Sequence, residues 1–243
     1  MPTFPFPAPD YLPHLRALTE AFAEEVRAGR FEAAVPCCGD WTRRDLVAHL
    51  GVVHRSVATI VETGQQVRVE AEMGEDPAGW YAESAARLLD VLAAADPDEP
   101  CRQFVGIEMT KAFWFRRQVH ETAVHLIDAH AARGGVVRLE PLVAADGVDE
   151  VLGRFLPVAA RFVAIPSLAA PIALHAGDLG CSWTLVPGAP PVLGEAEPVA
   201  TVEATVQELL MLLWKRGGIS PRITGAAEAE EAARGFLAAK LTP

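Results

Sequence analysis

From the N-terminus to about residue 132, apolar side chains recur at the spacing of an α-helix in four successive stretches. The first stretch runs from Asp10 to about Gly29. Thr42 can cap the second, with Asp45 in its first turn, and Asp76-Pro77 is a typical start for the third. The fourth runs from about Thr110 to Ala132. Four amphipathic helices with long connections favour a bundle whose interior can hold a metal.

Beyond Gly135 the sequence changes character. A helix is expected from Ala144 to Val163, followed by a region that prolines interrupt and that contains short strands. The expected strands are Pro171–His175, Cys181–Val186, Val199–Val202 and Arg222–Thr224, and the last two helices are Val206–Lys215 and Ala226–Leu241. We therefore predict the α+β class, with a helical bundle over residues 1–135 and a small α+β domain over residues 136–243.

Two of the predicted helices carry side chains that bind metal ions. In the fourth helix Glu121 and His125 are four residues apart, so they stack on one face about a turn from each other. If His49 of the second helix approaches them, the set becomes two imidazoles and one carboxylate. Three protein ligands with room for a fourth from solvent or substrate are typical of a catalytic zinc site. His120 lies roughly 100° around the helix from Glu121 and cannot share that face without distortion.

One polar stripe runs along the otherwise apolar fourth helix. It consists of Trp114, Arg117, Glu121, His125 and Asp128, at spacings of three and four. The stripe can be a solvated face or a functional one. Surface stripes usually carry Lys and Glu rather than His, Trp and Asp, which favours a functional face.

Two residues are predicted to take part in catalysis. His54, about one turn beyond His49, can line the same cavity and move protons. Arg117, like Arg55 and Arg116, can clamp a substrate carboxylate with bidentate hydrogen bonds. Ion pairs on a helix surface are the alternative for these arginines.

Other polar side chains near the predicted ligands each have more than one possible role. Asp128 could orient His125 through its second ring nitrogen, or it could cap the helix or pair with an arginine. Cys37-Cys38 precede the second helix and could supply a thiolate, or they could be small buried side chains.

Charge and composition exclude several classes of protein. A formal net charge of −11 without a Lys/Arg cluster argues against a nucleic-acid-binding protein. No apolar run approaches the roughly 20 residues needed to cross a bilayer, and the N-terminus lacks the features of a signal peptide. Four irregularly placed cysteines, two of them adjacent, are a poor basis for a disulfide framework. We expect a soluble protein of a reducing cytoplasm that acts on a small molecule.

Two motifs resemble those of a known family. They are Trp41-Thr-x-x-Asp-Leu-x-x-His49-Leu and Arg117-x-x-His120-Glu121-Thr-x-Val-His125-x-x-Asp128. Together they resemble the mycothiol-dependent maleylpyruvate isomerase family, within the broader DinB-like four-helix group. The resemblance extends to Ala204–Arg216 and Ile223-Thr-Gly225, which are similar to that family's sterol-carrier-like C-terminal domain.

The resemblance implies that His49, Glu121 and His125 hold a divalent metal, with zinc the first choice, and that mycothiol is the thiol cosubstrate. It also implies an actinobacterial source. The metal would bind the thiol as a thiolate and deliver it to a small electrophile. An isomerase of this kind adds the thiolate to a conjugated double bond and expels it after rotation. A thiol S-transferase leaves it on the product.

A different class of function remains open. The protein could be a non-catalytic binding module that keeps a metal for stability. A structural site is normally closed by a fourth protein ligand, for which His54, His120 or a cysteine are the candidates.

Overall fold

The computed structural model describes residues 4–102 and 108–242. The chain divides into two compact units, the first formed by Phe6–Val137 and the second mainly by the residues from Arg138 onward. Helices build the first unit, and a mixed sheet with helices builds the second. The predicted α+β class is confirmed.

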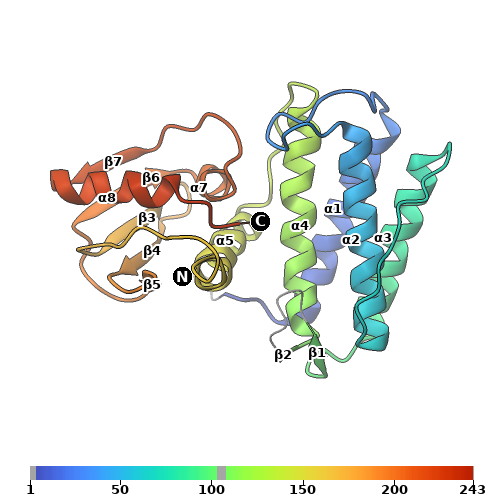
Figure 1. Cartoon of the computed structure of the whole chain (residues 1–243), viewed down its shortest axis with the longest axis horizontal. Helices are drawn as coiled ribbons and strands as arrows, with labels where there is room; N and C mark the ends of the chain where they lie inside the picture. Colours follow the sequence, from blue (N-terminus) through green and yellow to red (C-terminus); the bar gives the residue numbers. More distant parts are fainter. Residues whose placement is uncertain (1–3, 103–107, 243) are drawn as a thin grey trace. The chain divides into compact units, whose positions relative to one another are not determined.

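Four long helices form the first unit and lie side by side (Figure 1). They are α1 (Tyr11–Arg27), α2 (Arg43–Thr63), α3 (Pro77–Ala94) and α4 (Ala112–Ala131), with a short 3-10 turn, η1 (Ala8–Asp10), before α1. Helix α2 packs against α3 and α4, and α1 packs against the same two helices. The four helices expected from apolar periodicity are therefore confirmed, to within a few residues at each end.

Local sequence explains where two of these helices begin. The side chain of Thr42 accepts a hydrogen bond from the Asp45 amide, and Asp45 accepts one from the Thr42 amide, which completes a capping box at the start of α2. Asp76 caps α3 through the amide of Gly79. Both predicted caps are confirmed.

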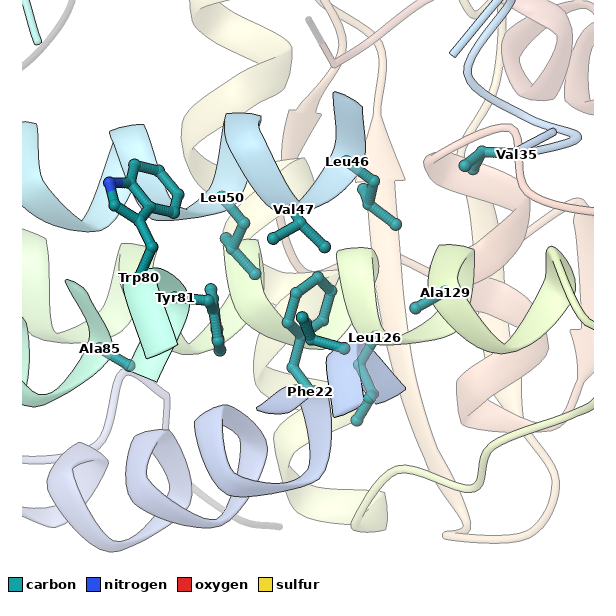
Figure 2. Close-up of a cluster of buried hydrophobic side chains, with 11 residues drawn as sticks. Phe22, Val35, Leu46, Val47, Leu50, Trp80, Tyr81, Ala85, Leu126 and Ala129 are labelled. Atoms are coloured by element: carbon teal, nitrogen blue, oxygen red, sulfur yellow. The ribbon is translucent and has the colours of Figure 1, made fainter. Parts of the chain in front are cut away.

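The core of the bundle draws one or more side chains from each helix (Figure 2). Phe22 of α1 and Tyr81 of α3 meet with ring centroids 4.8 Å apart. Leu50 of α2 and Leu126 of α4 belong to the same buried cluster. Each fully buried side chain of this kind contributes about 1.5–3 kcal/mol to folding. This packing holds α2 and α4 at a fixed separation.

A small hairpin comes before α4 and was not predicted. Strand β1 (Pro100–Arg102) pairs antiparallel with β2 (Glu108–Thr110), so that Cys101 lies opposite Met109. Three-residue strands are too short to show a period of two in the sequence.

The second unit begins with helix α5 (Pro141–Glu150), which leads into a π-helical turn, η2 (Val151–Phe155), and the short α6 (Leu156–Ala159). The helix expected from Ala144 to Val163 is present over residues 141–159, so it begins and ends earlier than expected, and it contains a π-helical turn that the sequence did not predict. Pro157 lacks the amide hydrogen that an α-helix needs, and the amide of Leu156 instead bonds to the carbonyl of Val151, five residues back.

A five-stranded sheet follows, in the order β5-β4-β3-β6-β7. The strands are β3 (Ile172–Ala176), β4 (Cys181–Val186), β5 (Val192–Leu193), β6 (Ala200–Ala204) and β7 (Arg222–Gly225). Strands β3 and β6 are parallel and the other pairs antiparallel. Helix α7 (Val206–Leu213) contacts β3, and α8 (Ala227–Ala238) contacts β6 and β7. Of these strands only the two-residue β5 was not predicted.

Among the described residues, no helix combines the length and the apolar character needed to cross a bilayer.

Candidate metal centre

The polar stripe of α4 is largely buried. Trp114 and Arg117 are each 4 % exposed, His125 is 7 % exposed and Asp128 is 1 % exposed. Glu121, in the middle of the stripe, is partly buried. The alternative of a solvated face is therefore wrong. Placing charged and polar groups in a core is unfavourable unless they are paired, so the contacts of this stripe are informative.

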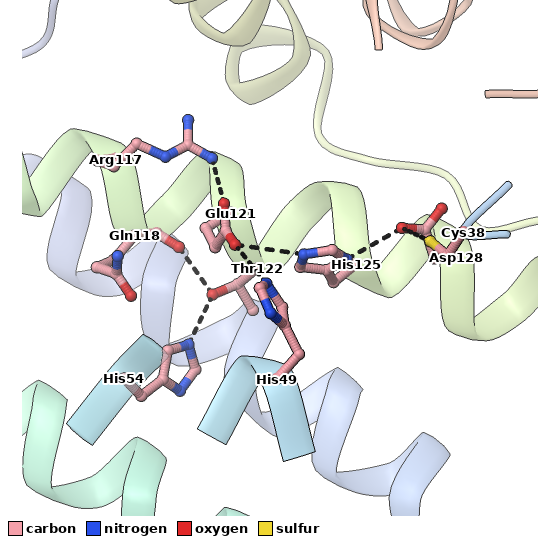
Figure 3. A network of polar contacts seen from close by, with 9 residues as sticks. All are labelled: Cys38, His49, His54, Arg117, Gln118, Glu121, Thr122, His125 and Asp128. Carbon is pink, nitrogen blue, oxygen red and sulfur yellow. Dashed lines mark hydrogen bonds and ion pairs between the residues drawn. The ribbon is translucent and has the colours of Figure 1, made fainter. Parts of the chain in front are cut away.

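The structure brings His49, Glu121 and His125 together (Figure 3). One potential ligand atom from each residue lies within 4.8 Å of those of the other two. Glu121 Oε1 is the meeting point, 3.2 Å from Nε2 of His49 and 3.3 Å from Nε2 of His125. The spacing of four along α4 aligns Glu121 with His125, and the packing of α2 on α4 supplies His49.

The second ring nitrogen of His125 faces Asp128. Its Nδ1 lies 3.0 Å from Asp128 Oδ2, and the same carboxylate oxygen accepts a hydrogen bond from the thiol of Cys38 at 3.5 Å. Of the roles considered for Asp128, the structure shows the contact with His125. Burial by itself would lower the pKa of His125, but hydrogen bonds to Asp128 and Glu121 raise it to about 9.

The other carboxylate oxygen of Glu121 faces Arg117. Arg117 lies four residues before Glu121 on the same helix, and its Nη2 donates a hydrogen bond of 2.7 Å to Oε2 of Glu121. Burial would raise the pKa of the Glu121 carboxyl, but the contacts with His125, His49 and Arg117 hold it well below its usual range. Glu121 is thus a carboxylate whose two oxygens have different partners.

An aromatic side chain that the sequence left without a role lies beside the two imidazoles. The ring of Trp41 is centred 4.9 Å from that of His49 and 6.5 Å from that of His125. Trp41 stands just ahead of the Thr42 cap, so the turn that starts α2 also places the indole. Its position at the start of a motif that contains His49 was the available signal.

His54 lies deeper in the bundle than the three-residue group. It is completely buried, and its Nε2 lies 3.2 Å from Oγ1 of Thr122. Thr122 donates its own hydroxyl proton to the carbonyl of Gln118, so it accepts from His54, and the imidazole carries its proton on Nε2. Burial lowers the pKa of His54 to about 3, which keeps it neutral.

The remaining candidates lie apart from the three-residue group. His120 is buried with its ring edge-on to Tyr11 at 6.5 Å. Arg55 donates to Ser84 and lies over the ring of Trp80. Cys37 and Cys38 are half-buried and form no disulfide. None of these side chains belongs to the described group that could hold a metal ion.

The donor set fits a divalent cation. Two imidazole nitrogens and one carboxylate oxygen converge from two helices, and an ion between them would replace the imidazole protons that now point at Glu121 Oε1. Among the described histidine, cysteine and acidic side chains, the group contains three members and no fourth. His49 is its most accessible member, with 36 % of its side chain exposed against 9 % for His125.

Comparison with known proteins gives concordant results for both units. The family model named mycothiol maleylpyruvate isomerase N-terminal domain matches residues 12–130. The family model of the C-terminal domain of these enzymes matches residues 143–234. No curated protein matches the chain.

Two solved structures are similar in fold. A crystal structure of the mycothiol-dependent maleylpyruvate isomerase has a TM-score of 0.69 and 12% identity over 92% of this chain and 96% of that one. A histidine-to-alanine mutant of such an enzyme has a TM-score of 0.67 and 13% identity over the same shares. At 12–13% identity the structural similarity shows only that the fold is shared. The two family models, which together span most of the sequence, show that the chain is a member of the family. The predicted family is confirmed, and the chain belongs to the mycothiol maleylpyruvate isomerase family.

Proposed function

We propose that the protein is a metal-dependent enzyme that activates mycothiol as a thiolate for reaction with a small electrophilic substrate. The observation that carries this proposal is the group of His49, Glu121 and His125, which gathers three ligand atoms within 4.8 Å of one another. Membership of the mycothiol maleylpyruvate isomerase family supports the choice of thiol.

The size of the group favours catalysis over a purely structural role. A structural site is normally closed by a fourth protein ligand, and three candidates for that ligand were His54, His120 and a cysteine. His54 bonds to Thr122, and Cys38 bonds to Asp128. Neither is part of the described group, which supports an open fourth position for a thiol.

A divalent ion, with zinc the first choice for two imidazoles and a carboxylate, would supply a Lewis-acid position that favours the thiolate form of a thiol. The protein residues prepare this position. Asp128 holds the Nδ1 proton of His125, so Nε2 is the nitrogen that faces Glu121. The exposed edge of His49 gives the thiol its approach.

Two outcomes for the substrate follow from the same activated thiolate. Addition to a conjugated cis double bond forms a carbon–sulfur bond and turns the double bond into a single one, while its electron pair moves onto the conjugated carbonyl as an enolate. Rotation and expulsion of the thiolate then give the trans isomer and return the thiol unchanged. An electrophile whose adduct instead takes up a proton from water, or loses a different leaving group, keeps the thiol as a thioether, which is S-transfer.

The two residues predicted to be catalytic are less accessible than the metal ligands. His54 is fully buried and neutral, so we propose that it supports α4 through Thr122 and that a water molecule moves protons at the exposed side. Arg117 is 4 % exposed and holds Glu121, a role developed in the next subsection.

We also propose that the protein works in a reducing cytoplasm. None of the four cysteines, all among the described residues, is paired in a disulfide, and mycothiol is a thiol of a reducing compartment.

The test compares the purified wild type with the Glu121→Ala variant, both supplied with zinc, mycothiol and maleylpyruvate. We expect the wild type alone to consume maleylpyruvate, and only when mycothiol is present. Recovery of free mycothiol identifies an isomerase, whereas a thioether product identifies a transferase. Metal retained by the wild type without any thiol binding would overturn the proposal in favour of a non-catalytic module.

A further inference from the structure

The two oxygens of Glu121 are assigned to different partners. Oε1 lies 3.2 Å from Nε2 of His49 and 3.3 Å from Nε2 of His125, so it faces the centre of the candidate metal site. Oε2 turns the other way and accepts a hydrogen bond of 2.7 Å from Nη2 of Arg117 (Figure 3). The carboxylate therefore offers one oxygen to the site and keeps the other for the guanidinium.

The Arg117 side chain is held firmly in this position. It is 5 % exposed, and it starts one turn before Glu121 on the same helix. An exposed ion pair would be weakened by water and by the freedom of both side chains, but burial removes most of that loss. A charged hydrogen bond of this length is also among the stronger contacts in a protein.

We infer that Arg117 is a positioning residue, which acts through Glu121 to keep one oxygen out of the metal site and so preserves an open position for the thiol. This inference rests on the proposed function. It replaces direct clamping of the substrate as the role of Arg117.

Two physical effects follow from this arrangement. A carboxylate that used both oxygens would occupy a second position in the site and compete with an incoming ligand. The guanidinium also offsets the charge of the carboxylate, so a divalent ion in the site would keep more of its attraction for an anionic thiolate. Loss of Arg117 therefore affects the binding of the thiol more than the binding of the metal.

The test uses the protein loaded with cobalt, whose visible absorption reports the number of its ligands. The variant Arg117→Met removes the charge and the donor at similar length, and Arg117→Lys keeps the charge without the planar fork. Arg87→Met is the matched control. Arg87 makes an ion pair with Glu62 at 2.8 Å, close to the 2.7 Å of the Arg117 pair, but its side chain and that of Glu62 are 45 % and 42 % exposed.

We expect the Arg117→Met protein to retain cobalt, to absorb less intensely because Glu121 adds its second oxygen, and to bind mycothiol about tenfold more weakly. The Lys variant should lie between this protein and the wild type, and the Arg87 variant should match the wild type. Loss of cobalt from both Arg117 variants, or unchanged absorption and unchanged mycothiol affinity in the Met variant, would overturn the role given to Arg117.

The wild-type protein tests the proposed function separately from the role of Arg117. Failure of the wild type to bind cobalt, or an absorption spectrum that mycothiol does not change, would remove the proposed function itself. If the Met variant does not fold, the Lys variant decides, because full mycothiol affinity there together with wild-type absorption shows that the planar fork is not needed and overturns the inference.

Discussion

Nδ1 of His125 lies 3.0 Å from Oδ2 of Asp128, one turn further along α4, and both side chains are buried. The carboxylate fixes the ring so that Nε2 points at Glu121 Oε1. A partner of this kind orients a histidine ligand and makes it a better donor to a metal. The same carboxylate accepts the Cys38 thiol, which links the loop before α2 to the ligand on α4.

The first prediction is that Asp128→Ala lowers zinc affinity by about tenfold or more, because the His125 ring loses its fixed orientation. Asp128→Asn should lower it less, since the amide oxygen can still accept from Nδ1. Affinity is measured by competition with a chromophoric chelator. Asp90→Asn, at an exposed position of α3, serves as the comparison. Equal affinity in all four proteins would show that the contact has no influence on the metal.

The second prediction concerns removal of the ligands themselves. Glu121→Ala and His125→Ala should each abolish binding of about one equivalent of metal, while the helical circular dichroism remains close to that of the wild type. Helix formation by α4 depends on its apolar contacts with α1 and α2 rather than on these two residues.

His175→Ala is the control for these variants. His175 lies on β3 and contacts Ser182, outside the three-residue group. Elemental analysis of the purified proteins gives the answer. Full occupancy in either ligand variant would mean that the metal binds elsewhere in the molecule.

The parts of the fold that could be predicted from the sequence are those that short segments specify. Thr42 with Asp45 and Asp76 with Pro77 mark helix starts because the capping contacts reach only three residues along the chain. The spacing of Glu121 and His125 likewise requires only the geometry of one helix. These predictions needed no knowledge of how the helices pack.

The parts that could not be predicted depend on contacts between distant segments. His49 meets Glu121 across 72 positions of sequence, and only the packing of α2 on α4 makes that contact. The position of Trp41 beside the two imidazoles and the burial of the polar stripe also depend on segments that are distant in the sequence. The β1–β2 hairpin and the π-helical turn before Pro157 are too short or too irregular to have a sequence period.

The third prediction tests the close approach of α2 and α3. A Cβ atom on Gly51 would lie 2.1 Å from Cζ3 of Trp80, whose ring is confined under Arg55. Gly51→Ala should therefore lower the free energy of unfolding by about 1–3 kcal/mol, despite the better helix propensity of alanine. Guanidinium unfolding followed by circular dichroism measures the change.

Gly235→Ala in α8 is the control for this prediction. An added Cβ at Gly235 has no atom within 4 Å outside its own helical backbone and chain neighbours. This substitution should leave stability unchanged or raise it by up to about 1 kcal/mol. A Gly51→Ala protein as stable as the Gly235→Ala protein would mean that the Trp80 ring can move aside.

The fourth prediction concerns acid sensitivity and His54. Burial lowers the pKa of His54 to about 3 in the folded protein, with smaller effects from Glu121, which raises it, and from His125 and His49, which lower it. In the unfolded chain the imidazole has a pKa of about 6.5. Between these values the unfolded chain binds a proton that the folded protein does not, so stability falls as the pH falls from about 6.5 toward 3.

In the middle of that window, His54 alone makes the free energy of unfolding change by about 1.4 kcal/mol per pH unit. His54→Gln keeps an amide donor for Thr122 but has no proton to gain, so its stability should fall less steeply between about pH 6.5 and pH 5. Urea unfolding of the metal-free protein at several pH values measures both slopes. His14→Gln, at a partly buried histidine of α1, is the control for the histidine-to-glutamine substitution itself. Equal slopes for the wild type and the His54 variant would show that His54 takes up its proton without unfolding, and therefore that water reaches it in the folded bundle.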